Sequence, residues 1–185
     1  MNIIIAGCGK VGRALAEQLS REKHDITVID RKPEAIQQIT NIADVRGVVG
    51  NGASFEIQMD AGIDTADLMI AVTDADEVNL LCCLIAKKAG GCQTIARVRN
   101  PVYHHEIHHI KDELGLSMVI NPEWAAAMEM ARLLRFPSAI DIDTFANGRI
   151  ELLRFQLEEQ NPLCNNKIKD LHMLSRCEVL ICIVE

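Results

Sequence analysis

The sequence predicts an α/β fold: a doubly wound parallel sheet of Rossmann type, followed by the start of a small α+β domain. Two observations predict it. Short apolar runs alternate with segments of helical pattern through the first two-thirds of the 185 residues, which is typical of a parallel sheet covered by helices on both faces. The first apolar run leads directly into a glycine cluster and a helix, as a nucleotide-binding sheet of this kind begins.

The expected strands are short and apolar, because both faces of such a sheet are buried. They cover residues 2–6, 26–30, 45–49, 68–72, 94–98 and 117–120. Helices are expected over residues 10–22, from Pro33 onward, and over residues 54–61, 77–89, 103–114 and 122–134. Right-handed crossovers between parallel strands then produce the doubly wound form.

The residue pattern of the sequence changes after the long helix, which cannot continue past Pro137. "AIDIDTF" and "RIELLRFQL" alternate as strands around an Asn147-Gly148 turn, a short helix is expected in "NPLCNNKIKDLHML", and "CEVLICIVE" reads as a last strand. We therefore expect a nucleotide-binding domain over residues 1–135 and part of an α+β domain over residues 136–185. The late apolar strand suggests that the chain stops partway through that domain.

Composition excludes several classes. A net charge of −7 argues against a nucleic-acid partner, which needs a basic face. The seven cysteines include no CxxC pair, which argues against zinc ribbons and redox dithiols and favours reduced thiols. The start of the chain lacks the features of a signal peptide, and no apolar run approaches the ~18 residues that span a bilayer. A cytoplasmic location is expected.

The glycine cluster has the spacing of a dinucleotide fingerprint. Gly7, Gly9 and Gly12 form GxGxxG between a strand and a helix, and Asp30 follows eighteen residues after the last glycine, at the end of the second strand. In such a loop the glycines permit a tight turn, a close approach of the backbone to a pyrophosphate, and close packing of helix on strand. The helix N-terminus then faces the phosphates.

Asp30 is expected to accept hydrogen bonds from the ribose hydroxyls of an adenosine. That favours NAD(H), ADP or ATP over NADP, whose 2′-phosphate would meet a like charge. Arg31 and Lys32 leave this preference open, since a neighbouring cation accommodates such a phosphate. The alternative for Asp30 is a capping role at the strand end.

Further polar residues follow other strands, at the edge where ligands of parallel sheets bind. We expect Asn51 and Gly52 to face the adenine, Thr73 and Asp74 the second ribose or the phosphates, and Arg97 the phosphates or the distal half of the ligand. The alternative for each is an ordinary polar loop.

Two residues within the loop carry open alternatives. Lys10 is either a point charge for a terminal phosphate or solvent-exposed. Cys8 is either a thiolate favoured by the helix terminus or, by the burial habits of cysteine, a small side chain that fits.

The "YHHEIHH" segment contains two i,i+4 pairs of histidines, His104 with His108 and His105 with His109. We prefer a solvated helix face to a metal site here, and no metal is expected.

No catalytic residues are expected. The only tyrosine, Tyr103, has Ile107 where a short-chain reductase has lysine, and no nucleophile elbow occurs. About fifty residues follow the long helix over residues 122–134, too few for a substrate domain. A nucleotide site without reacting groups suits a sensor. The alternatives are an NAD-dependent oxidoreductase whose substrate domain is missing from this chain, and a purely structural oligomerisation module.

The segments "IIIAGCGKVGRALAEQL", "DITVID", "GNGAS", "ADLMIAVTDADEVNLLCCLIAK", "TIARVRNP" and "VINPE" together resemble the RCK, or KTN, family, the N-terminal domains of cytosolic regulatory subunits of Trk-type potassium uptake systems. The resemblance covers residues 1 to about 135. It implies a nucleotide at the fingerprint, dimers and higher rings formed through the helix over residues 122–134, and docking on the inner face of the membrane through a potassium transporter.

The residues that match binding positions of the family are Gly7, Cys8, Gly9, Lys10, Val11, Asp30, Asn51, Gly52, Thr73, Asp74 and Arg97. Lys10 falls where ATP-selective relatives often carry arginine, which puts NAD(H) ahead of ATP or ADP as the expected ligand. Glu123 matches an acid that lies near the dimer seam and a divalent cation in some relatives.

Overall fold

The computed structural model describes residues 1–146, 149–161, 163–164, 166–168 and 180–184. It divides into two compact units, Met1–Ala126 and Ala127–Glu185. Each unit is described by itself below. The boundary between the units lies inside the long helix, whereas the domain boundary expected from the sequence follows that helix.

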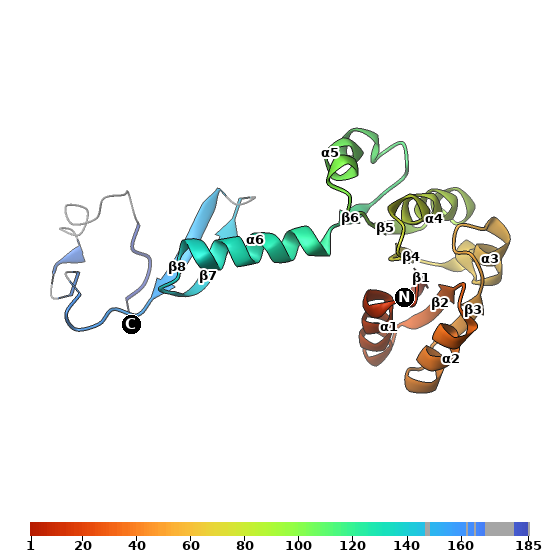
Figure 1. The fold of residues 1–185 in the computed structure, drawn as a ribbon, viewed down its shortest axis with the longest axis horizontal. Helices are drawn as coiled ribbons and strands as arrows, with labels where there is room; N and C mark the ends of the chain where they lie inside the picture. Colours follow the sequence, from red (N-terminus) through yellow and green to blue (C-terminus); the bar gives the residue numbers. More distant parts are fainter. Residues whose placement is uncertain (147–148, 162, 165, 169–179, 185) are drawn as a thin grey trace. The chain divides into compact units, whose positions relative to one another are not determined.

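The first unit is built on a six-stranded parallel sheet (Figure 1). Its strands are β1 (Asn2–Ala6), β2 (Asp25–Asp30), β3 (Arg46–Val49), β4 (Leu68–Ala71), β5 (Gln93–Arg97) and β6 (Met118–Ile120). Their order across the sheet is β3-β2-β1-β4-β5-β6, and each described pairing is parallel. The doubly wound fold expected from the sequence is confirmed, with its switch point between β1 and β4.

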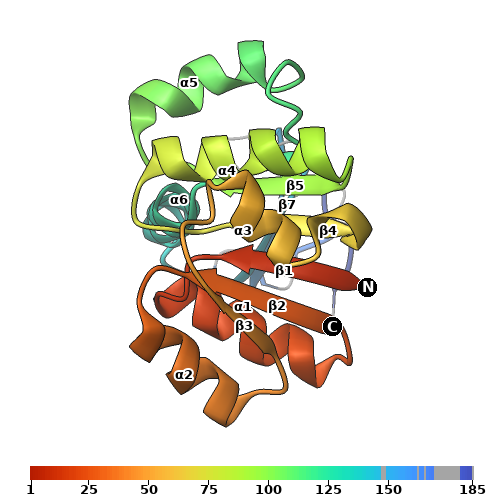
Figure 2. The same cartoon turned by 90° about the vertical axis from the view of Figure 1, so that its right-hand side faces the viewer.

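Helices cover both faces of this sheet (Figure 2). They are α1 (Lys10–Arg21), α2 (Pro33–Ile42), α3 (Phe55–Asp60), α4 (Asp76–Ala89) and α5 (Pro101–Ile110), with a 3-10 turn, η1, at Ile63–Thr65. The next helix, α6 (Pro122–Arg135), follows β6 and contains the boundary between the two units. Pro33 and Pro101 each occupy a first-turn position, where the missing N–H costs nothing. The helix expected over residues 103–114 begins two residues earlier and ends at Ile110, and residues 111–115 form turns.

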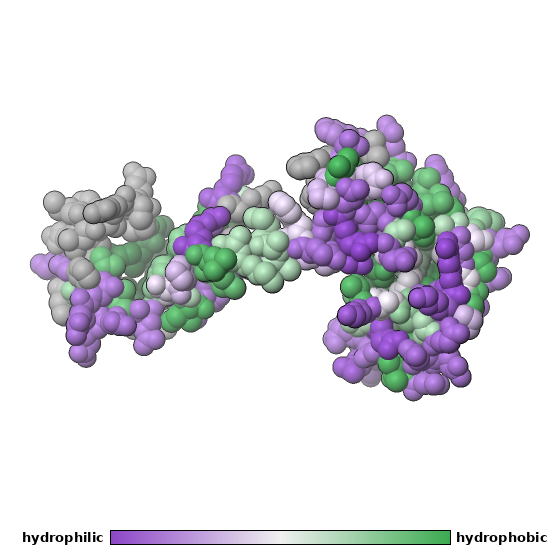
Figure 3. Space-filling model, viewed as in Figure 1, coloured by the Kyte–Doolittle hydropathy of each residue, from purple (hydrophilic) through white to green (hydrophobic). Residues whose placement is uncertain are grey.

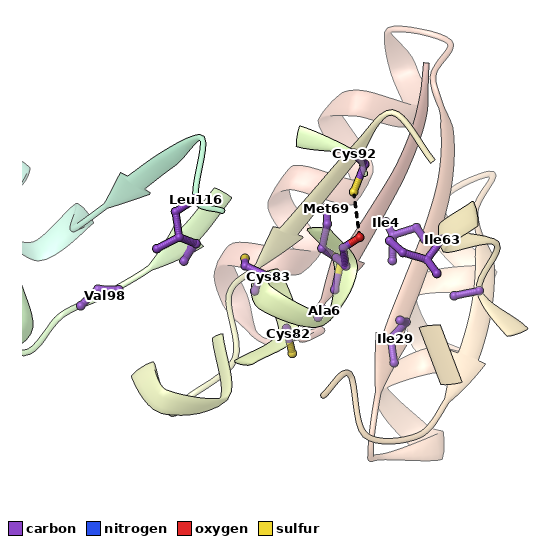
Figure 4. Close-up of a cluster of buried hydrophobic side chains, with 14 of the residues drawn as sticks. Ile4, Ala6, Ile29, Ile63, Met69, Cys82, Cys83, Cys92, Val98 and Leu116 are labelled. Atoms are coloured by element: carbon purple, nitrogen blue, oxygen red, sulfur yellow. Dashed lines mark hydrogen bonds between the residues drawn. The ribbon is translucent and has the colours of Figure 1, made fainter. Parts of the chain in front are cut away.

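Alternate residues of β1 enter two separate cores, because successive side chains of a strand point to opposite faces. Ile3 and Ile5 pack into the core that also contains Ala16 of α1. Ile4 and Ala6 pack into the core that contains Cys82, Cys83 and Ala86 of α4 (Figure 4). The two cores explain why the strand reads as a continuous apolar run.

The buried cysteines behave as small apolar side chains. Cys82 and Cys83 are fully buried, and Cys92 is nearly so. Burial raises the pKa of the Cys82 thiol to about 12 and that of the Cys83 thiol further still. Each described cysteine is a free thiol, and these three pack in the core as small apolar side chains.

The second unit contains a two-stranded antiparallel hairpin, β7 (Ala139–Phe145) and β8 (Ile150–Phe155). These are the two strands expected around the Asn147-Gly148 turn, although residues 147 and 148 lie outside the described residues. Most of the expected short helix lies outside them too. The expected last strand is wrong for residues 180–184, which have no regular structure; among the described strands of this unit, β7 and β8 pair only with each other.

Helix α6 carries exposed apolar side chains. Among its described residues none is buried, and Met130, Leu133 and Leu134 are exposed. Apolar side chains are visible along α6 and the hairpin in Figure 3. Within the described part of the chain, no helix combines the length and apolar character needed to cross a membrane.

Candidate nucleotide-binding site

The glycine loop lies at the switch point of the sheet, between the end of β1 and the start of α1. Backbone hydrogen bonds fasten it on both sides: the Gly7 amide donates to the Ile29 carbonyl at 2.8 Å, and the Val72 amide donates to the Ala6 carbonyl at 2.8 Å. The loop is thus held between β2 and β4. A ligand of an open parallel sheet binds at this position.

Two of the three fingerprint glycines are required by the fold itself. Gly7 has a φ of +103°, which L side chains rarely adopt, and a Cβ there would lie 2.8 Å from the Thr73 nitrogen. A Cβ on Gly12 would lie 1.8 Å from the Gly7 carbonyl oxygen. The tight turn and the close helix packing expected from the sequence are both present.

Gly9 differs from the other two. Its φ is −74°, which any residue adopts, and no heavy atom of the described residues lies within 4 Å of an added Cβ. Gly9 is the N-cap of α1, the described structure gives it no side-chain capping bond, and the first turn of α1 carries no acidic residue. The space beside Gly9, at the positive end of the α1 dipole, is therefore open, an arrangement suited to an anion.

Asp30 reaches the glycine loop, as the fingerprint spacing predicts. Its carboxylate accepts a hydrogen bond from the Cys8 amide at 2.7 Å through Oδ2 and one from the Lys32 amide at 2.9 Å through Oδ1. Asp30 thus has the capping role that the sequence left as its alternative. Because an ionised carboxylate has about four acceptor positions, the ribose role stays open.

Cys8 is a packing residue of the loop. Its side chain is buried, and its Sγ lies 3.5 Å from the Ala35 carbonyl oxygen of α2. Burial, and then the nearby Asp30 carboxylate, raise the pKa of this thiol. The structure therefore favours the small side chain that fits over the thiolate. Lys10 and Arg31 are both exposed.

The residues after β3 meet the end of β1. A Cβ on Gly52 would lie 2.9 Å from the Cβ of Ala6, so this backbone crosses close to the sheet edge. The Asn51 Oδ1 accepts a hydrogen bond from the Ala53 amide at 3.2 Å, which tightens the turn. The structure thus brings Asn51 and Gly52 beside the strand that leads into the glycine loop.

Thr73, which follows β4, and Arg97, which ends β5, have partners that the sequence analysis missed. The Thr73 hydroxyl donates to the Asn79 Oδ1 at 2.7 Å. The guanidinium of Arg97 forms an ion pair with Glu123 in the first turn of α6. Asp74 is exposed. Asn79 is the polar residue in the apolar "VNLLCCL" segment of α4. That position was the one sequence feature that could have indicated a buried hydrogen-bonding role for it.

Asp76 fixes the segment after β5. Its buried Oδ2 accepts hydrogen bonds from the amides of Arg99 and Asn100 at 2.9 and 2.8 Å, and the Arg99 Nε lies 3.6 Å from its Oδ1. These contacts compensate the burial of the carboxylate. They also hold the chain at the exit of β5.

The histidine segment gives no metal site in the part that is described. The side chains of His104, His105 and His108 lie outside the described residues, and His109 is exposed. Among the described residues, no group of three or more histidine, cysteine, aspartate or glutamate side chains is placed to hold a metal ion.

The family profile of the TrkA-N domain matches residues 3–122. A Trk system potassium uptake protein TrkA homolog of Archaeoglobus fulgidus is 38% identical over 173 residues, which is 94% of this chain and 39% of that protein. A TrkA homolog 1 of Methanosarcina mazei is 37% identical over 186 residues, 97% of this chain and 41% of that protein. The chain thus spans about two-fifths of the length of these curated relatives.

Solved structures share the fold of the first unit. The TrkA-N domain of the Escherichia coli inner membrane protein ybaL matches with a TM-score of 0.64 and 26% identity, over 72% of this chain and 96% of that one. The GsuK channel bound to NAD matches with a TM-score of 0.56 and 20% identity, over 64% and 21%. The Kef C-terminal domain of Shewanella denitrificans, in AMP-bound form, matches with a TM-score of 0.59 and 22% identity, over 72% and 82%.

Proposed function

This chain belongs to the TrkA-N domain family, and from that premise we propose that it is the nucleotide-sensing part of a regulatory subunit that gates a membrane potassium uptake transporter. The relatives that match most of its length are named as potassium uptake proteins of the Trk system. They are named for a transport system and not for a reaction, which supports a regulatory role rather than an enzymatic one. The oxidoreductase alternative has no observation in its favour.

The main support for the nucleotide role is the difference between Gly9 and the other two fingerprint glycines, Gly7 and Gly12. Gly7 and Gly12 are explained by the protein's own backbone, since a side chain at either position would collide with it. Gly9 has no such explanation within the described structure, because a Cβ there would meet open space. A glycine that the fold does not need, at the N-cap of α1, is explained by a phosphate that approaches the backbone.

Each predicted site residue has a place in this proposal. The pyrophosphate lies over the glycine loop, the adenosine ribose at the β2 edge, the adenine beside the turn after β3, and the distal half over β4 and β5. The residues are, in chain order, Gly7, Cys8, Gly9, Lys10, Val11, Gly12, Asp30, Arg31, Asn51, Gly52, Thr73, Asp74 and Arg97.

NAD(H) is the first candidate ligand, and ATP or ADP is the alternative. The Asp30 carboxylate disfavours the 2′-phosphate of NADP. Lys10 presents a single ammonium charge, whereas the bidentate guanidinium of an arginine would bind a terminal phosphate better. Among the structural neighbours, GsuK is described bound to NAD and also bound to ADP. At their identity of 20% these neighbours show the fold alone, so the ligand of this chain is a proposal.

Assembly and location belong to the same proposal. Residues 1–135 form the nucleotide-binding domain, and residues 136–185 begin a second, C-terminal domain. The exposed Met130, Leu133 and Leu134 of α6 are covered by a second copy, and dimers build higher rings. The assembly is cytoplasmic and is held at the inner face of the membrane by its transporter.

The direct test is a titration of the purified chain with NADH, NAD, ADP and ATP by isothermal calorimetry. We expect saturable binding of at least one of them with one site per chain, and weaker binding of NADP than of NAD. No binding of any of the four would refute the nucleotide role. Gating is tested with the full-length protein and its reconstituted transporter, whose potassium flux must change with the nucleotide that binds.

Glu123→Gln is expected to tighten binding of NAD about threefold to fivefold, as measured without divalent cations. Arg97 must release Glu123 before it reaches a ligand phosphate, and an ion pair of this kind is worth up to about 1 kcal/mol. Glutamine keeps the shape and removes the competing charge. If the affinity stays within twofold of wild type, Arg97 remains with α6 and does not contact the ligand. Glu129→Gln, on a later turn of α6, is the control for the loss of one negative charge.

A further inference from the structure

We infer that Asn79 is a positioning residue for the distal half of the nucleotide site, because its side-chain amide joins the end of β4 to the end of β5. The inference rests on the proposed function and adds a role that the fingerprint does not contain. Asn79 lies on α4 and is fully buried, so it acts through the two residues that it holds, Thr73 and Arg97.

The amide of Asn79 uses all of its hydrogen-bonding positions on these two residues. Its Oδ1 accepts from the amide and the hydroxyl of Thr73, each at 2.7 Å. Its Nδ2 donates to the carbonyl of Arg97 at 2.9 Å and to the carbonyl of Thr73 at 3.3 Å. Two acceptor and two donor positions are the full capacity of this side chain.

The connection begins where the sheet ladder ends. The last described pair of the β4–β5 ladder is Ala71 with Ala96, and Thr73 and Arg97 lie beyond it. The Asn79 amide therefore continues, with a side chain, the link that backbone hydrogen bonds make earlier in the strands. Because α4 is a 14-residue helix packed on β4 and β5, this link is anchored to a rigid element.

The glycine loop is held by a different set of contacts. The Gly7 amide bonds to the Ile29 carbonyl and the Cys8 amide bonds to Asp30 on the β2 side, and the Val72 amide bonds to the Ala6 carbonyl on the β4 side. None of these bonds involves Asn79. In the sheet order, β2 and β1 lie to one side of the switch point, and β4 and β5 lie to the other. Loss of the Asn79 amide should therefore disturb the distal half of a dinucleotide and leave the adenosine half in place.

The test compares the affinities for NAD and for AMP in wild type and in the variants Asn79→Leu and Asn79→Ser. Leucine has a similar size and neither bonding group, and serine is the milder change if leucine prevents folding. We expect NAD affinity to fall about tenfold or more, since several buried hydrogen bonds are lost, while AMP affinity stays within about threefold. The measured quantity is the ratio of the two affinities, which a general loss of stability would leave unchanged.

Thr94→Val is the matched control. Thr94 is also fully buried, and its hydroxyl donates to the Gly115 carbonyl at 2.9 Å, but it lies near the start of β5, away from the site edge. We expect a lower melting temperature and an unchanged NAD-to-AMP ratio. The inference is overturned if the Asn79 variants lower both affinities in parallel, or if wild type binds NAD no more tightly than AMP. If wild type binds neither ligand, the proposed function fails first.

Discussion

Gly9→Val is expected to lower the affinity for the bound nucleotide about 100-fold or more, a loss of about 2.7 kcal/mol of binding free energy. The isopropyl group would occupy the space in front of the first amides of α1, which the proposal assigns to the pyrophosphate. The free energy of unfolding should fall by no more than about 1 kcal/mol, because the backbone angles suit any residue and the change only replaces glycine as N-cap. Gly9→Ala should give an intermediate loss of affinity.

The measurement pairs calorimetric titration with urea denaturation of the same samples. Gly12→Ala is the contrasting variant, because its Cβ would lie 1.8 Å from the Gly7 carbonyl oxygen. It should lose about 3 kcal/mol or more of stability, with binding lost through misfolding of the loop. A Gly9→Val protein that is folded and binds nucleotide like wild type would contradict the proposal, since the open space at Gly9 would then have no ligand in it.

The fold of the first unit was predictable because it depends on local patterns. A strand buried on both faces must be apolar throughout, and Ile3, Ile4, Ile5 and Ala6 are. The turn and the helix after it require glycine at two positions, and the sequence supplies Gly7 and Gly12. Handedness and the alternation of strands with helices then restrict the strand order to few possibilities.

The partners of the site side chains were not predictable in the same way. Asn79 bonds to a carbonyl 18 residues away, and Arg97 pairs with an acid 26 residues away. Such contacts depend on where the strand ends and the following helices meet at the edge of the sheet. The hydrophobic periodicity of the sequence does not contain this information. A polar side chain in an apolar helix face indicates that a partner exists without identifying it, since burial of an amide is costly unless it is bonded.

The hairpin and the end of the chain show the same distinction. The strands β7 and β8 are neighbours in sequence, so alternation and one turn sufficed to predict them. The expected last strand depended on a partner elsewhere, and residues 180–184 are not paired with either strand. Apolar composition alone did not make this segment a strand.

Asp30→Ala is expected to lower nucleotide affinity at least tenfold and the free energy of unfolding by about 1–3 kcal/mol, because the carboxylate accepts two backbone amides. The two losses have separate origins. One is the released Cys8 amide, which loosens the glycine loop. The other is the loss of an acceptor for the ribose hydroxyls. Asp25→Ala, an exposed acid at the opposite end of β2, is the control for the change in net charge.

A ligand that lacks one hydroxyl separates the two origins. If Asp30 accepts the ribose hydroxyls, wild type should bind 2′-deoxy-ADP about tenfold less tightly than ADP, since a charged acceptor loses its donor. Asp30→Ala should then bind both ligands with equal, weakened affinity, because the acceptor is absent in either complex. If wild type does not distinguish the two ligands while Asp30→Ala weakens both, Asp30 acts only by holding the Cys8 amide. The fingerprint acid would then be a structural part of the loop, and the preference for NAD over NADP would need another residue.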